Sequence, residues 1–219
     1  MDIIMNIILG TIGRIVATAI LFLASILYKI GYKDEIRFNL TAARTAIYQI
    51  QNQHLFPEDY ALVISQIDIL HRCAFCIFRN LYPLSLLRDR NAKKMIITLL
   101  YDIIVVCEKA KYTTVGYNGL DEKEARLNSI HKFFYKYGPL DDRNYSTVLA
   151  QLDIIENLIN GKTIKNSIIE AFGNLADEVP IEDLVCDGFF DINSFKQKYD
   201  KDMRRKCFSR DEIELLLRN

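Results

Sequence analysis

The pattern of apolar and polar positions divides the chain into two unequal parts. The segment from Ile3 to Tyr28 is almost wholly apolar and contains one charged residue, Arg14, and one amide, Asn6. About 20 apolar residues are enough to cross a bilayer as a helix. The pattern therefore predicts a single transmembrane helix, with residues 1–32 as a membrane anchor.

The carboxyl-terminal end of this segment has the residues expected at a membrane surface. Aromatic and basic side chains are typical of the level where a helix passes from hydrocarbon to headgroups. Counting back about 20 residues at 1.5 Å per residue places Arg14 about one turn inside the other interface, so its side chain could reach outward. The residues assigned to the anchor are Ile3, Arg14, Leu21, Leu23, Tyr28, Lys29, Tyr32 and Lys33.

Two alternatives to an uncleaved signal-anchor stay open. A cleaved signal peptide is suggested by small residues at Ala17, Ala19, Ala24 and Ser25, but Asp2 stands where a basic residue is usual and the apolar run is long. The other alternative is a soluble helical oligomer that buries residues 3–28. The uncleaved anchor is the preferred interpretation.

The flanking charges predict the orientation of the anchor. Lys29, Lys33 and Arg37 follow the apolar segment, whereas Asp2 precedes it. The excess of Lys and Arg is normally cytoplasmic, so residues 31–219 are expected in the cytoplasm. The five cysteines agree with a reducing compartment, because their number is odd and they are scattered.

A short heptad pattern follows the anchor. Apolar residues recur at steps of four, three, four and three, at Ile36, Leu40, Ala43, Ile47 and Ile50. Such a seam suits a self-associating stalk that continues the membrane helix. It suits equally an amphipathic helix packed on its own domain, which is the preferred interpretation, and a homo-oligomer remains possible.

The rest of the sequence predicts an all-α fold. Residues 33–176 are expected to form a helical bundle, and residues 177–219, which carry blocks of opposite charge, a small helical appendage. Between residues 103 and 106 a β-branched run makes a strand the lesser alternative. The helices expected are Pro57–Leu81, Met95–Ala110, Asp121–Tyr137, Asp141–Asn160, Thr163–Phe172 and a terminal helix opened by a capping box of Ser209 and Glu212.

Composition and motifs exclude several kinds of function. The chain has 28 basic and 28 acidic residues, and a net charge near zero disfavours sequence-independent binding of nucleic acid. It contains no glycine-rich phosphate loop and no metalloprotease or hydrolase motif, so no cofactor or metal is expected. The pair Cys73 and Cys76 lies within an apolar helical pattern, which predicts buried structural thiols.

One spacing suggests an enzyme. Arg126 and His131 form an R-x4-H motif on a predicted helix, which resembles the active-site motif of the HEPN ribonuclease superfamily. The resemblance implies that these two residues meet their counterparts at a dimer interface, where a cation and an imidazole assist RNA cleavage. Leu127 stands where that family commonly has a polar residue. The alternative is that His131 is an ordinary helix residue.

Taken together, the sequence favours a membrane-anchored cytoplasmic α-helical protein that acts through contacts with an unknown protein partner. A regulator, an assembly factor, or an effector or immunity component would have this organisation. An enzyme is the less favoured class, represented by the membrane-tethered HEPN-like ribonuclease with Arg126 and His131.

Overall fold

The computed structural model describes residues 2–52, 60–81, 89–112, 147–173, 184 and 206–218. All regular structure in these ranges is α-helical, so the all-α prediction is confirmed for this part of the chain. The expected helix Asp121–Tyr137 lies outside the described residues. The helices are α1 (Asp2–Asn52), α2 (Tyr60–Leu81), α3 (Arg90–Tyr112), α5 (Thr147–Ile159), α6 (Ile164–Phe172) and α9 (Arg210–Arg218).

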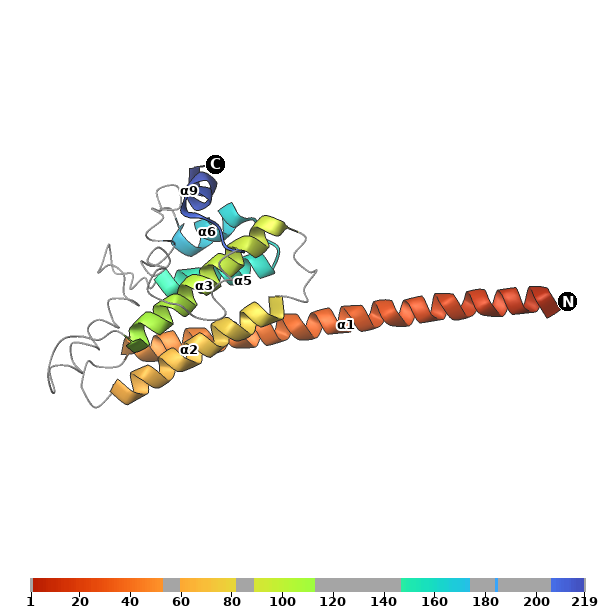
Figure 1. Cartoon of the computed structure of the whole chain (residues 1–219), viewed down its shortest axis with the longest axis horizontal. Coiled ribbons are helices and arrows are strands. Elements are labelled where there is room, and N and C mark those ends of the chain that lie inside the picture. The colour runs from red at the N-terminus through yellow and green to blue at the C-terminus, as the bar shows by residue number, and fades with distance from the viewer. Residues whose placement is uncertain are drawn as a thin grey trace.

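Helix α1 is a single uninterrupted helix of 51 residues. No proline breaks it, and at 1.5 Å per residue it extends about 77 Å. Its amino-terminal part projects away from the other helices, whereas its carboxyl-terminal part lies among them (Figure 1). The expected membrane helix and the expected stalk are therefore one element.

The bundle is built around α1, α2, α3 and α5. Helix α2 packs against both α1 and α3, and α5 packs against α1 and α3. The core consists of aliphatic side chains from all four helices, because each presents an apolar face at helical spacing. The largest of the fully buried side chains are Ile36, Leu40, Ile47, Ile50, Ile67, Leu70, Ile77, Leu81, Met95, Ile96 and Leu99.

The heptad seam lies inside this core. Ile36, Leu40, Ala43, Ile47 and Ile50 are all fully buried within the single chain. Packing of α1 on its own domain therefore accounts for the seam without a second copy. Self-association through these residues stays an untested prediction.

Two helices begin at capping residues that can be recognised in the sequence. The side chain of Thr163 caps α6 by accepting a hydrogen bond from the backbone N–H of Asn166 at 3.2 Å. At the start of α9, the backbone N–H of Ser209 donates to Glu212 Oε2 at 2.7 Å, and the N–H of Glu212 donates to Ser209 Oγ at 3.3 Å. This reciprocal pair is the capping box that the sequence predicts.

The described end of the chain packs on α3. The backbone N–H of Phe208 donates to Thr98 Oγ1 at 2.8 Å, and Lys94 Nζ lies 2.6 Å from Glu212 Oε1. Ile213 is fully buried and belongs to the bundle's hydrophobic core. The described part of the predicted appendage thus shares the bundle's core, and the boundary proposed at residue 177 lies outside the described residues.

The burial of the seam predicts the effect of a charge within it. Ile47→Asp places a carboxylate at a fully buried position, and an unpaired buried charge costs several kcal/mol. We expect the full-length protein in detergent to lose most of its helical circular dichroism signal. The control is Tyr48→Asp, because Tyr48 is exposed. A folded Ile47→Asp protein that has only lost self-association would favour the stalk interpretation instead.

Candidate functional site

The most distinctive surface of the described protein is the projecting part of α1. Every side chain from Ile15 to Tyr28 is exposed, and Leu21 is 71% exposed and Phe22 65%. Fully burying one large apolar side chain contributes about 1.5–3 kcal/mol. The large exposed side chains of this segment are Ile15, Val16, Ile20, Leu21, Phe22, Leu23, Ile26, Leu27, Tyr28 and Ile30. Scaled by the exposed fraction of each side chain, their exposure to water is unfavourable by roughly 10 kcal/mol in total.

This exposed run is uninterrupted along the helix. Figure 1 shows no other described helix beside this part of α1. Leu21 and Leu23, which the sequence assigns to the anchor, lie near its middle. The backbone of Ile3, Arg14 and Lys29 continues the same helix, but their side chains lie outside the described part of the structure.

Two of the predicted interface residues are in contact. The hydroxyl oxygens of Tyr28 and Tyr32 are 2.6 Å apart, and their ring centroids are 4.4 Å apart in an edge-to-face arrangement. Residues four apart share one face of a helix, so this contact follows from their spacing. Tyr32 also packs against the bundle core. The aromatic pair therefore joins the exposed segment to the bundle.

The change from exposed to buried is abrupt. Ile30 is 51% exposed, whereas Ile36 is fully buried. Fewer than two helical turns separate the two positions at about 3.6 residues per turn. The apolar segment therefore meets the bundle without a flexible linker between them.

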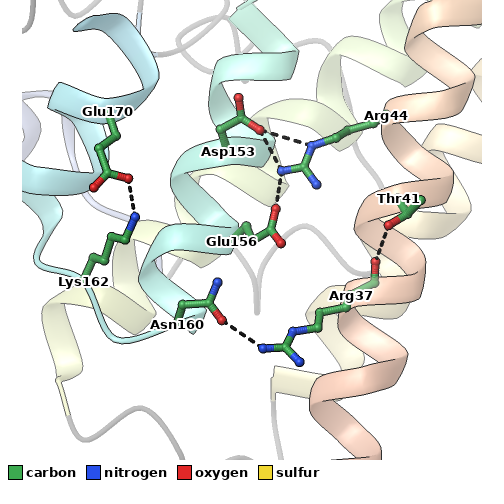
Figure 2. A network of polar contacts seen from close by, with 8 residues as sticks. All are labelled: Arg37, Thr41, Arg44, Asp153, Glu156, Asn160, Lys162 and Glu170. Carbon is green, nitrogen blue, oxygen red and sulfur yellow. Dashed lines mark hydrogen bonds and ion pairs between the residues drawn. The ribbon is translucent and has the colours of Figure 1, made fainter.

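Polar contacts fix α1 to α5 just beyond this junction. Arg44 donates from Nε and Nη2 to Asp153 Oδ1, at 3.1 and 2.7 Å, and from Nη2 to Glu156 Oε2 at 2.5 Å. Nearer the projecting segment of α1, Arg37 Nη2 donates to Asn160 Oδ1 at 3.3 Å. Figure 2 shows these contacts along one side of α5.

The environment of Arg44 keeps its guanidinium group protonated. Partial burial acts to lower the pKa of Arg44, but its hydrogen bonds to Asp153 and Glu156 outweigh that effect and raise it. Charge-assisted contacts of this kind are the stronger class of hydrogen bond. The sequence identified Arg37 only as a flanking charge and did not identify Arg44. More than 100 residues separate Arg44 from its partners, so no local pattern could have paired them.

Helix α2 is the second described helix that is long and apolar enough to span a membrane. In its most apolar window 39% of the residues are buried, compared with none in that of α1. It also carries two polar contacts with α3: Asp68 with Lys111 at 2.5 Å, and His71 Nε2 with Glu108 Oε1 at 2.8 Å. We therefore assign α2 to the bundle.

Burial shifts the pKa values of two titratable side chains where α2 and α3 pack together. Burial, assisted by the charge of Lys111, lowers the pKa of His71 despite the nearby Glu108 and Asp68. Burial raises the pKa of the Cys107 thiol, which is fully buried. Both groups are thus held in their neutral forms.

Cys73 of the Cys-x-x-Cys pair is likewise kept in its uncharged thiol form. Cys73 is buried and Cys76 is half-buried, and neither forms a disulfide. Burial, followed by the influence of Cys76, raises the pKa of Cys73. A reactive thiol needs the opposite shift, so these observations support the interpretation as structural thiols.

A buried polar contact that the sequence did not reveal joins α3 to α5. Gln151 Nε2 donates to Asp102 Oδ2 at 2.7 Å and to the backbone carbonyl of Leu184 at 2.9 Å. Asp102 and Gln151 are fully buried. The contact ties residue 184 to the bundle, and it aligns α3 with α5.

The residues of the predicted ribonuclease motif, Arg126 and His131, lie outside the described residues. That hypothesis stays untested. Within the described ranges, no group of three or more His, Cys, Asp or Glu side chains is arranged to hold a metal ion.

Comparison with models of protein families, with curated proteins and with solved structures finds no match to this chain. The candidate function therefore rests on the physical character of α1 and its junction with the bundle.

Because Arg44 contacts two carboxylates, we expect it to contribute measurably to the free energy of unfolding. We expect Arg44→Gln to lower the free energy of unfolding of the full-length protein by about 1–2 kcal/mol, because it removes the hydrogen bonds to two carboxylates. The control is Arg37→Gln, which removes a longer hydrogen bond to Asn160 and an exposed ion pair with Asp34 and should cost less than about 0.5 kcal/mol. Urea unfolding followed by circular dichroism measures both changes. Equal losses in the two variants would contradict the role given to Arg44.

Proposed function

We propose that the protein is a single-pass membrane protein whose anchor is the projecting part of α1 and whose helical bundle acts in the cytoplasm through contacts with proteins. The observation that carries this proposal is the fully exposed apolar surface of α1 from Ile15 to Tyr28. Hydrocarbon is the solvent that suits such a surface on all sides of one helix.

The length of the apolar segment supports a complete crossing. Hydrocarbon about 30 Å thick requires about 20 helical residues. Counting back from Tyr32 by that number reaches Gly13. Residues 2–12 continue the helix and would lengthen it into the opposite headgroup layer or allow it to tilt.

The cytoplasmic orientation is supported by the positive charges that follow the segment. Lys29, Lys33 and Arg37 lie on the bundle side of the apolar surface. These three residues are within the short distance over which the positive-inside rule operates.

Action through protein contacts is supported by two features. A membrane anchor raises the effective concentration of the bundle for partners at the same bilayer, so weak contacts suffice. Large apolar side chains also remain exposed on the bundle part of α1 and α2: Phe38, Tyr48, Leu62 and Ile69. Such residues, if covered by a partner, would supply apolar contact area.

Membrane insertion is tested with charges in the middle of the exposed segment. Each lysine at the centre of a membrane helix opposes insertion by about 3 kcal/mol. We expect the full-length double variant Leu21→Lys, Leu23→Lys to leave the membrane fraction in a flotation gradient, while the unaltered protein floats with membranes after carbonate washing. The control is Phe38→Lys, Tyr48→Lys, which adds the same charge to exposed positions of the bundle. Recovery of the unaltered protein in the carbonate supernatant would refute the anchor.

Orientation is tested by protease protection. If the bundle is cytoplasmic, protease added outside intact spheroplasts should leave the full-length protein whole, and lysis should allow cleavage. A cytoplasmic protein and an outward-facing epitope serve as controls for membrane integrity. Cleavage of the bundle in intact spheroplasts would show the opposite orientation.

A further inference from the structure

The end of the bundle from which α1 projects carries a group of basic side chains drawn from three parts of the chain. Lys33 and Arg37 belong to α1, Arg79 to the last turn of α2, and Lys162 and Lys165 to the start of α6 and the turn before it. We call these five residues the basic rim.

A contact and the course of the chain place several of these residues at the end of the bundle from which α1 projects. Arg37 donates to Asn160, which is two residues before Lys162, and Figure 2 shows Lys162 at the Arg37 end of this network. Helix α2 runs antiparallel to α1, so its final turn lies beside the junction (Figure 1). The hydrogen bond with Tyr28 raises the pKa of the Tyr32 hydroxyl, and Arg79 lies near enough to Tyr32 for its positive charge to oppose that rise.

The rim is accessible and has an excess of positive charge. Arg37, Arg79, Lys162 and Lys165 are exposed, and Lys33 is half-buried. Among the residues that the structure describes, the carboxylates at this end are Asp34, Glu35 and Glu170; Asp34 pairs with Arg37 at 3.7 Å, and Glu170 pairs with Lys162. The opposite charges of Asp89 and Arg90, at the start of α3, cancel each other in this count.

The position of the rim relative to the anchor determines what it faces. Arg37 is five residues beyond Tyr32, which corresponds to about 7.5 Å along the helix axis. This distance is within the Debye length of about 8 Å at physiological ionic strength. Because α1 is continuous and has no linker at the junction, the rim is held at the level of the lipid headgroups.

We propose that the basic rim docks the bundle against anionic lipid headgroups and so fixes its orientation on the membrane. The proposal rests on the membrane anchor proposed above. The lipid surface is the favoured occupant because the rim lies at the end of the bundle from which the proposed anchor projects and its charge is complementary to the cytoplasmic leaflet. Each basic residue near an anionic surface favours docking about fivefold.

The test uses the full-length protein with one fluorescent reporter. The chain has no tryptophan, so Asn166→Trp introduces a unique one. Asn166 is exposed in the first turn of α6, and only its backbone N–H takes part in the cap. The protein is reconstituted into vesicles whose headgroups carry a dansyl acceptor, made of phosphatidylcholine alone or with about one third phosphatidylserine.

We expect energy transfer from the reporter to be higher in vesicles that contain phosphatidylserine, and the difference to disappear at about 1 M salt. The double variant Arg79→Glu, Lys165→Glu should reduce the ratio of docked to undocked bundle at least about 25-fold. The matched control is Arg72→Glu, because Arg72 is exposed on α2 but lies about 10 Å farther from the membrane than Arg79.

The outcomes separate the two proposals. Equal transfer in both vesicle types, from protein that floats with the vesicles, would overturn docking by the rim and leave the anchor intact. Failure of the protein to float with either vesicle type would overturn the anchor. Loss of the transfer on addition of an RNA oligonucleotide, with flotation unchanged, would identify the rim as a polynucleotide surface and would also overturn the proposal.

Discussion

The structure depends on one helix that serves two different environments. Around Ile20 and Leu27 the apolar side chains of α1 are exposed on every side, whereas from Ile36 to Ile50 one face of the helix is buried in the core of the bundle. A helix that is apolar on all sides suits a lipid environment, and a helix with a single apolar face suits the surface of a domain. The same uninterrupted backbone carries both patterns, so the position of the bundle and the direction of the projecting apolar segment are mechanically linked.

The contacts around the junction determine how firmly this link is held. Ile36 begins the buried face within two turns of the last exposed residues, and Arg44 ties the same helix to α5 through two carboxylates. The ion pairs alone contribute modestly because their carboxylates are partly exposed. Aliphatic burial along α1 supplies most of the stabilisation, and the polar contacts select which side of α5 faces α1.

Polar groups inside the bundle have a similar role in alignment. Asp68 and His71 are spaced three apart on α2, and their partners Lys111 and Glu108 are spaced three apart on α3. The two pairs match only in one antiparallel register of the helices. Gln151 and Asp102 do the same for α3 and α5. Aliphatic side chains would tolerate small shifts between helices, whereas the hydrogen bonds of Gln151 would lose their geometry and the ion pairs their close approach.

Local patterns in the sequence determined the type of each described helix and several of their ends. The spacing of apolar residues identified α2, α3 and α5, while Thr163 and the pair of Ser209 and Glu212 marked the starts of α6 and α9, because caps depend on residues three positions apart. The long apolar run could be recognised from the sequence because it too is a local pattern. Only the tertiary structure decided that the heptad seam is covered by the chain itself, that Arg44 meets α5, and that Gln151 meets Asp102. Those contacts join residues far apart in the chain, and their partners depend on how the helices pack rather than on any local spacing.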